Sequence, residues 1–244
     1  MTANWIFTVL GFGTQQFVWA LAVTIVFSVV ARWLRGVSSS GAIAGAFVCF
    51  VLYVSAGPGA FLVLVSVFLV TWLATRFGYK RKQKLGTAEN RAGRTASQVL
   101  ANLAAAAGCV AISAFLRENI FLIAGIAALA EAAADTVSSE MGQVSVETVR
   151  LVTNWRAVPA GTNGGVSPLG TLSGVVAAAI VSAIAFLAGL VSLRGAYVSL
   201  FGGVAGMIAD SYLGATLERR GMLGNDGVNF ISTLIAAGVA LVLA

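Results

Sequence analysis

Long apolar runs, separated by short polar or glycine-rich stretches, make up most of this chain. A helix needs roughly 20 apolar residues to cross a bilayer, with about 17 at the lower end. Eight runs are candidates: 17–34, 41–56, 59–75, 98–116, 119–135, 172–193, 196–217 and 228–244. The second and third are short and joined by Gly57 and Pro58, which predicts a tight hairpin or a re-entrant pair. We expect an all-α polytopic membrane bundle that forms a single transmembrane domain over residues 1–244.

The composition supports a membrane protein and excludes some kinds of chemistry. Hydrophobic residues make up 59% of the chain and charged residues only 10%, whereas soluble domains are about half apolar and about a quarter charged. The chain contains no histidine, which excludes imidazole bases and His-ligated zinc. Cys49 and Cys109 lie inside apolar runs, where free cysteines usually serve as small buried hydrophobes.

The positively charged residues fall almost entirely on one side of the predicted membrane. If the eight segments alternate in direction, all 15 lysines and arginines except Arg117 and Arg194 lie in loops at one end. The positive-inside rule makes that end cytoplasmic. This predicts cytoplasmic loops at 76–96 and 138–171, and it places both termini outside.

The polar stretches of the chain converge on the same cytoplasmic face. They are 38–41, 76–94, 131–142, 161–171 and 210–214. A transporter is expected to place polar groups near the membrane midplane, with access from both sides. Polar chemistry at one face instead favours an enzyme that works at a membrane interface.

Acidic residues lie at or near the inner ends of two predicted helices, where a lipid-facing helix would carry apolar side chains. They are Glu131, Asp135, Glu140 and Asp210. Carboxylates at such a depth are costly and rare unless a cation, a polar cavity or a partner neutralises them. Because Mg²⁺ bound with substrate phosphates takes only one or two protein carboxylates, we expect a magnesium site drawn from Asp135, Glu140 and Asp210. The alternative is that each carboxylate makes a buried hydrogen bond to a neighbouring helix.

A glycine-rich stretch leads directly into the predicted helix that begins at residue 172. Its polar and glycine residues are Gly161, Thr162, Asn163, Gly164, Gly165 and Ser167. Glycines let the backbone approach an anion closely, and a helix N-terminus offers free N–H groups and a positive dipole end. The Gly-Lys-Ser/Thr ending of a P-loop is absent. We expect this stretch to hold donor phosphates, and the alternative is a turn followed by an N-cap.

Further polar residues near this face complete the predicted site. From the basic 76–94 loop we expect Lys82 and Arg94 to bind substrate phosphates, although such cations can also serve only to set topology. Asn102 joins them, because an amide inside an apolar helix needs a partner. Ser39 and Ser40 precede another outward-going helix and are also expected to contact the cofactor.

Two helix starts share one spacing pattern. Ser38-x-x-Gly41-x-x-x-Gly45 recurs as Ser167-x-x-Gly170-x-x-x-Gly174. This indicates either an internal repeat or two helix starts that both need an N-cap and a small-residue packing face. For Gly45 and Gly174 we favour packing.

These features together indicate phosphoryl transfer. Magnesium-binding carboxylates, a glycine cradle and cations, with no nucleophilic histidine or cysteine, suit a reaction that depends on positioning and charge neutralisation. An active site at a membrane interface favours a lipid phosphate as acceptor and a nucleoside triphosphate from the cytoplasm as donor. Glu131 or Glu140 would complete the metal site or activate the acceptor phosphate.

Motifs along nearly the whole chain resemble the phytyl-phosphate kinase family, whose animal members are called transmembrane protein 19. The matching blocks are Ser39-Ser40-Gly41-Ala42, 84–94 with 98–102, 131–136 with 139–142, 161–167, 210–215 and 225–230. The resemblance implies an integral membrane kinase that uses CTP to convert phytyl phosphate to its diphosphate for tocopherol or phylloquinone synthesis. Leu103 stands where the family often has Gly, and Glu218 where Gln is common, but neither departure touches the carboxylates.

Two other functions fit the same residues. A CTP-using cytidylyltransferase acting on a lipid phosphate would need the same metal and phosphate groups. A lipid or ion transporter would need neither nucleotide nor magnesium. For the kinase, the expected partners are a prenyl or phytyl phosphate, a nucleoside triphosphate and membrane lipids, and we expect no nucleic acid.

Overall fold

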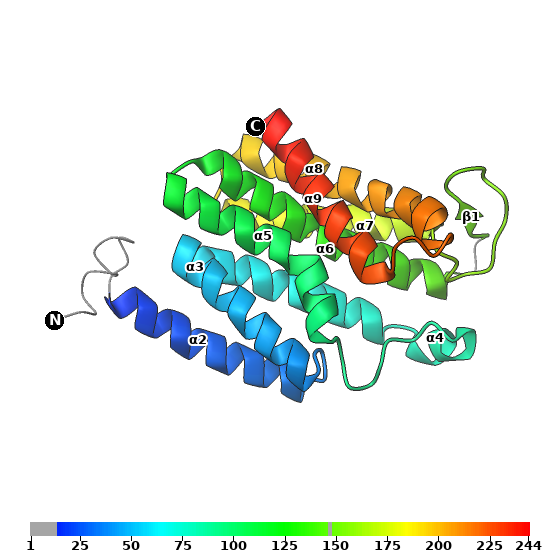
Figure 1. The fold of residues 1–244 in the computed structure, drawn as a ribbon, viewed down its shortest axis with the longest axis horizontal. Helices are drawn as coiled ribbons and strands as arrows, with labels where there is room; N and C mark the ends of the chain where they lie inside the picture. Colours follow the sequence, from blue (N-terminus) through cyan, green and yellow to red (C-terminus); the bar gives the residue numbers. More distant parts are fainter. Residues whose placement is uncertain (1–13, 146–147) are drawn as a thin grey trace.

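The computed structural model describes residues 14–145 and 148–244, and this part of the chain is almost entirely helical (Figure 1). Its helices are α2 (Thr14–Trp33), α3 (Ser39–Arg76), α4 (Tyr79–Leu85), α5 (Ala96–Leu116), α6 (Asn119–Val144), α7 (Pro168–Leu187), α8 (Leu193–Leu213), the π-helix η1 (Gly214–Glu218) and α9 (Asn225–Leu243). The strands β1 (Arg150–Leu151) and β2 (Gly165–Val166) form a small antiparallel pair in the α6–α7 connection. The predicted all-α membrane bundle is confirmed.

The helix α3 is a hairpin. Gly57, at φ +73, interrupts the helical backbone directly before Pro58. Gln16 at the start of α2 donates to the carbonyl of Val54 at 3.0 Å, so the first arm of α3 runs antiparallel to α2. The second arm returns, because Trp72 donates to the carbonyl of Leu34 at 3.2 Å, beside the end of α2.

Seven of the described helices are long and apolar enough to cross a membrane. Because one of them, α3, has two arms, the bundle contains eight membrane-length segments, as the hydrophobic pattern predicts. Each arm of α3 rises about 27 Å, which is close to the roughly 30 Å hydrocarbon core. Large apolar side chains such as Phe115, Leu187 and Val242 point outward from the bundle, as lipid-facing residues should.

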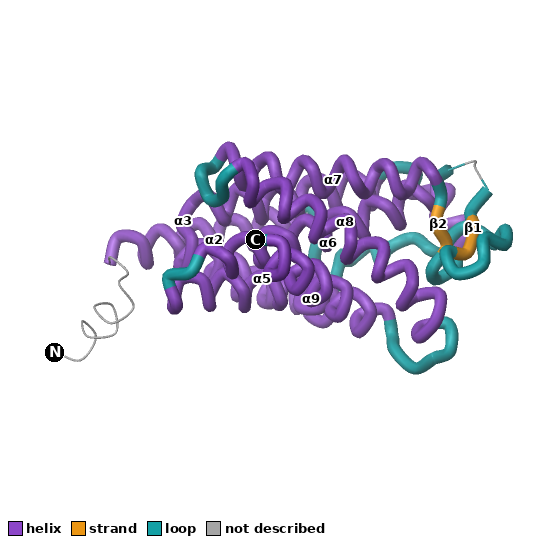
Figure 2. Tube along the Cα trace, turned by 90° about the horizontal axis from the view of Figure 1, so that it is seen from above, coloured by secondary structure: helices purple, strands orange, loops and turns teal. Residues whose placement is uncertain are grey.

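The helix α6 lies at the centre of the bundle and packs against α3, α5, α7, α8 and α9 (Figure 2). Residues 124–134 of α6 are all buried, and seven of these eleven residues are alanine. Such small side chains let neighbouring helices approach closely, which is the usual basis of helix packing in membranes. The acidic end of α6 is therefore surrounded by other helices and faces no lipid.

The polar stretches meet at one end of the bundle, which we call the loop end. There α2, α6 and α8 end, and α5, α7 and α9 begin, and both ends of α3 lie there too. The loops that carry α4 and the β1–β2 pair extend from the loop end (Figure 1). Arg117 and Arg194 lie at the opposite end, beside the α5–α6 and α7–α8 connections. The predicted convergence of the polar segments is confirmed.

Candidate active site at the loop end

Two carboxylates from different helices meet at the centre of the loop end. Asp135 of α6 and Asp210 of α8 have side chains close enough to share a hydrogen bond. Ser232 of α9 donates to Asp210 Oδ2 at 3.1 Å. The only salt bridge that the described residues form involves neither Asp135 nor Asp210. Arg94 nevertheless lies close enough to Asp135 to act on it electrostatically.

Glycines on α8 bring these carboxylates together. A Cβ built on Gly203 would lie 2.8 Å from the Cβ of Ala130, and one on Gly206 would lie 2.8 Å from the carbonyl oxygen of Ser232. Any larger side chain would push α8 away from α6 and α9. Asp210 reaches Asp135 because α8 can pack this closely.

Glu131 lies one helical turn deeper in the membrane than Asp135. Its side chain is 1% exposed and lies beside Ser232. Its Oε1 atom has no hydrogen-bond partner among the described residues. Glu131 belongs to the same carboxylate cluster as Asp135 and Asp210, but it is set behind them.

A polar cavity with about 700 Å³ of empty space opens beside Asp135 and Asp210, and we call it the glycine cavity. The predicted glycine-rich residues line it: Gly161, Thr162, Asn163, Gly164, Gly165 and Ser167. Ser138, Ser139 and Ser211 add hydroxyl groups, and Glu218 lies at its edge. The glycine stretch and the carboxylate pair, distant in sequence, therefore form one site.

Close backbone contacts hold the glycine stretch in place. Gly164, at φ +75, sits against the backbone of Ala215 in η1, where a Cβ would clash. Its carbonyl accepts a bond from the amide of Val152 at 3.0 Å. Ser167 caps α7 by accepting from the amide of Gly170 at 3.1 Å, so the N-cap interpretation holds for Ser167. The capped N-terminus of α7 nevertheless opens toward the glycine cavity.

Contacts between α7 and α6 place that N-terminus beside the carboxylates. A Cβ on Gly170 would lie 2.7 Å from the carbonyl oxygen of Ser138, and one on Gly174 would lie 2.8 Å from that of Ala134. The packing role favoured for Gly174 is confirmed. The same role is wrong for Gly45, because a Cβ there would meet no described atom within 4 Å outside its own helical turn.

A second polar cavity, with about 630 Å³ of empty space, lies on the other side of Asp135, and we call it the arginine cavity. Arg94, Gln98 and Asn102 line one wall, and Thr136 and Glu140 of α6 line the other. Arg94 donates through Nη2 to the hydroxyl of Thr136 at 3.2 Å. Arg94, Gln98 and Asn102 therefore share one cavity wall, although Arg94 lies just before α5.

The backbone of Arg94 is held by the connection between α2 and α3. Its carbonyl accepts from Ser38 N at 2.9 Å, and its amide donates to Gly36 O at 3.1 Å. Ser39 and Ser40 belong to the same support, since Ser40 accepts from the amide of Ala96 at 3.3 Å and Ser39 accepts from Arg32 at 3.4 Å. Within the described part of the chain, these two serines line neither polar cavity.

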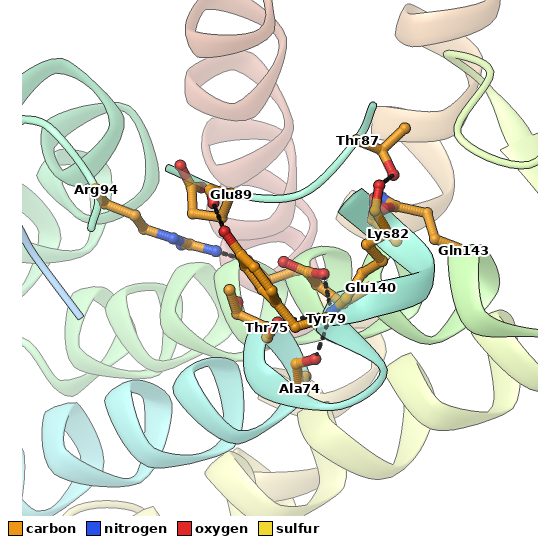
Figure 3. A network of polar contacts seen from close by, with 11 residues as sticks. Ala74, Thr75, Tyr79, Lys82, Thr87, Glu89, Arg94, Glu140 and Gln143 are labelled. Atoms are coloured by element: carbon orange, nitrogen blue, oxygen red, sulfur yellow. Dashed lines mark hydrogen bonds and ion pairs between the residues drawn. The ribbon is translucent and has the colours of Figure 1, made fainter. Parts of the chain in front are cut away.

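Lys82 and Glu140 form a buried ion pair of 2.6 Å (Figure 3). Lys82 is fully buried and also donates to the carbonyls of Ala74 and Thr75 at 2.9 and 2.7 Å. These contacts occupy all three ammonium protons. Lys82 therefore anchors α4 and orients Glu140. The ammonium group of Lys82 is paired with Glu140 and does not line the arginine cavity in the described chain.

Four residues line both polar cavities: Asp135, Ser139, Gln143 and Asn225. Three of them lie at spacings of four along α6, which puts them on one face. The α6 face that begins with Asp135 is therefore the boundary between the glycine and arginine cavities. A group bound in one cavity can meet a group bound in the other at this boundary.

The oxygen donors at this boundary suit Mg²⁺. Asp135 and Asp210 are carboxylates of two different helices with hydroxyl groups beside them, and Mg²⁺ accepts one or two protein carboxylates with substrate phosphates and water. The described residues contain no group of three or more acidic or cysteine side chains arranged to hold a metal. Glu140, paired with Lys82, shares a cavity with Asp135 but lines no cavity with Asp210 in the described chain.

Several residues of the site come from α9, where no site residue was predicted. Asn225 and Asn229 line the arginine cavity, and Ser232 contacts Asp210. Their spacings of four and three place them on one face of α9, whose residues 234–243 are all apolar or glycine. Polar residues on one face of a membrane-length helix indicate a polar contact, and Asn102 was predicted on the same basis.

The sequence matches a known family over most of its length. Residues 22–237 match the model of a family described as "Integral membrane protein DUF92". The chain is 31% identical over 228 residues to "Uncharacterized membrane protein MJ0933" of Methanocaldococcus jannaschii, covering 92% of each chain. It is 30% identical over 223 residues to "Protein VTE6, chloroplastic" of Arabidopsis thaliana, covering 86% of this chain and 66% of the relative. No solved structure matches it.

The match extends through the helices and loops that build both polar cavities, from the second half of α2 to α9. It agrees with the bundle of membrane-length helices and with the motif blocks that resemble phytyl-phosphate kinases. The chain belongs to the DUF92 family of multi-pass integral membrane proteins.

Proposed function

We propose that this protein is an isoprenoid-phosphate kinase that transfers a phosphoryl group from a nucleoside triphosphate to a prenyl monophosphate. One observation carries the proposal: a glycine-lined cavity and an arginine-lined cavity meet at Asp135, beside Asp210. Two phosphorylated substrates can thus bind on either side of one carboxylate pair. The relative VTE6 and the motif resemblance point to a prenyl-phosphate kinase-like family.

The donor phosphates belong in the glycine cavity. Its backbone at 161–165 and the N-terminus of α7 offer N–H groups to an anion, and Asp135 and Asp210 would hold Mg²⁺ beside them. When bound, Mg²⁺ neutralises charge on the donor phosphates. CTP as the donor, rather than another nucleoside triphosphate, rests on the resemblance alone.

The acceptor phosphate belongs in the arginine cavity. The guanidinium of Arg94 suits a phosphate because it is planar, always charged and rich in donors. Gln98, Asn102 and Asn229 supply uncharged hydrogen-bonding groups around it. Bound there, an acceptor oxygen faces the α6 boundary and the donor beyond it.

In the transfer step, an oxygen of the lipid phosphate attacks the γ-phosphorus of the donor. The bond from that phosphorus to the β,γ-bridging oxygen breaks, and the nucleoside diphosphate leaves with its electron pair. A monoester phosphate has its second pKa near 6, so the acceptor is already ionised at neutral pH. The chain needs to position the groups and neutralise charge, and it needs no strong base.

Product identification tests the proposal. Purified protein is incubated with Mg²⁺, each nucleoside triphosphate in turn, and labelled phytyl or geranylgeranyl phosphate. A lipid diphosphate with a nucleoside diphosphate supports the kinase. A CMP-lipid with pyrophosphate would assign the alternative cytidylyltransferase. Absence of both products, together with no thermal stabilisation by any nucleotide, would contradict the kinase and favour a transporter.

The Asp135→Asn variant tests the assigned site. We expect activity to fall by about 100-fold or more, because a group that stabilises transition-state charge is worth that much, while folding and membrane insertion stay unchanged. The control is Glu118→Gln, an exposed acidic residue before the opposite end of α6, which should keep full activity. Full activity in Asp135→Asn would rule out the metal assignment.

A further inference from the structure

A third cavity, largely apolar, lies among α2, α3, α5 and α6, with about 640 Å³ of empty space. Sites for small ligands are mostly lined by apolar side chains, with a few polar groups that fix orientation. Phe27, Leu64, Val67 and Phe68 form much of its surface. None of these side chains takes part in the phosphate chemistry proposed above.

This apolar cavity borders the arginine cavity at two shared lining residues. Arg94 and Asn102 line both. A molecule with a phosphate on Arg94 therefore has an apolar space directly behind its phosphate. Leu103 also lines this space.

The apolar cavity extends well into the membrane. Leu64 lies 12 residues before the end of α3 at Arg76, which corresponds to a depth of roughly 18 Å below the loop end. Phe27 packs edge-on against Phe61 and Phe68, with ring centroids 5.6 and 5.5 Å apart. Phe27 and Phe68 both line the cavity, so part of its wall is aromatic.

Gly45 lines this cavity at an intermediate depth on the first arm of α3. A Cβ on Gly45 would meet no described atom within 4 Å outside its own helical turn, whereas one on Gly41, a turn earlier, would clash with the backbone of Arg94. Gly41 therefore serves packing, and Gly45 leaves space. A larger side chain at position 45 would occupy the cavity without displacing the backbone.

We propose that the apolar cavity holds the hydrocarbon chain of the lipid monophosphate, and that Gly45 determines which chain lengths the enzyme accepts. This inference rests on the proposed function. The chain enters behind Arg94 and runs toward Leu64, between the two arms of α3 and α5. A short prenyl group ends above position 45, and a long one must pass it.

The test compares chain-length preference in the wild type and in Gly45→Leu. Activity is measured with dimethylallyl, geranyl and geranylgeranyl phosphate. We expect Gly45→Leu to lower kcat/KM for geranylgeranyl phosphate relative to dimethylallyl phosphate by about tenfold or more, since each group excluded from an apolar pocket changes selectivity by about that factor. Gly45→Ala should fall between the wild type and Gly45→Leu.

The matched control is Gly108→Leu. Gly108 is also a mid-helix glycine, and a Cβ added there would meet no described atom within 4 Å outside its own turn. Unlike Gly45, it is exposed on α5 and lines none of the three cavities in the described chain. It should keep the wild-type preference. An unchanged preference in an active, folded Gly45→Leu would overturn the inference.

A binding measurement separates this inference from the proposed function. A geranylgeranyl phosphate with a photoreactive group at its end should label the 61–68 segment in the wild type, and Gly45→Leu should reduce the labelling. If the labelling behaves in this way but the protein has no kinase activity, the cavity remains assigned as a lipid-phosphate site and the proposed kinase function is rejected. Absence of labelling there, or equal competition by an ordinary bilayer phospholipid, would reject the cavity assignment.

Discussion

Glu131 is a carboxylate that lies near Asp135 and Asp210 but outside the polar cavities of the described chain. It contacts Ser232, which in turn contacts Asp210, and in the described chain it lines neither the glycine nor the arginine cavity. Its position indicates that it orients Asp210 through Ser232. We regard Glu131 as a positioning residue.

The Glu131→Gln variant should therefore keep most of its activity. Glutamine preserves the shape and can still bond Ser232, so we expect kcat to fall by less than about tenfold, whereas loss of a general base costs 10²–10⁴-fold. The pH profile of kcat should keep its shape. A loss of 100-fold or more in a protein with unchanged melting temperature would show that Glu131 acts on the substrate directly.

Lys82 is a second residue whose role only its contacts reveal. In Lys82→Met, Glu140 would be left as a buried carboxylate without its cation, which typically destabilises a protein by about 3–5 kcal/mol. Thermal unfolding in detergent should show a clearly lower melting temperature. The control is Lys84→Met, an exposed lysine on the same helix, which should leave it unchanged.

The double variant Lys82→Met with Glu140→Gln refines that test. Removing both charges avoids the unpaired carboxylate, so it should recover part of the lost stability. If the double variant is no more stable than Lys82→Met alone, the buried pair is not the source of the effect.

Among the elements of the fold, the glycine stretch between β1 and α7 shows how a loop becomes a binding surface. Gly164 has a positive φ and also sits against Ala215 of η1. Two separate requirements thus meet at one residue: a left-handed backbone and a close approach. The close approach joins the loop to η1, which directly follows α8, the helix that carries Asp210.

We expect Gly164→Ala to reduce kinase activity by about 100-fold, because small displacements of positioning groups can cost that much. The control is Gly189→Ala, at the opposite end of the bundle. Gly189 also has a positive φ, but a Cβ there would meet no described atom within 4 Å. Both variants share the left-handed strain, so equal losses of activity would show that strain alone is responsible.

The starts of α3 and α7 share one sequence pattern, but the second glycine of the pattern has a different role in each helix. Ser38 and Ser167 cap their helices in the same way, each accepting from a glycine amide at 3.1 Å. One helical turn beyond Gly41 and Gly170 the two diverge, since Gly174 packs against α6 and Gly45 faces a cavity. The caps follow from local spacing, but the role of each later glycine depends on which helix lies opposite.

For the whole molecule, the charge distribution predicts an orientation that labelling can measure. Thr153 and Asn119 are exposed at the loop end and at the opposite end, respectively. An impermeant thiol reagent applied to intact cells should label Asn119→Cys, and it should label Thr153→Cys only after permeabilisation, because the positive-inside rule makes the loop end cytoplasmic. The reverse pattern would place the loop end, and with it the proposed active site, outside.

Some features of this protein follow from sequence alone because they depend on local composition and spacing. The apolar runs determine the membrane-length helices, including the turn at Gly57 and Pro58, and the alternation of those helices brings the polar stretches to one end. Deep carboxylates such as Asp135 and Asp210 stand out because burial makes them costly. The fold class and the central acidic pair were predictable for these reasons.

Tertiary structure alone decided which neighbour each polar group meets. The three donors of Lys82 are occupied by two carbonyls and Glu140. Asn225 and Asn229 of α9 line the arginine cavity. Gly45 lines an apolar space behind Arg94. These contacts join residues far apart in the chain, and they depend on how closely the helices pack. Sequence spacing determines the face of a helix on which a residue lies, but packing determines what that face meets.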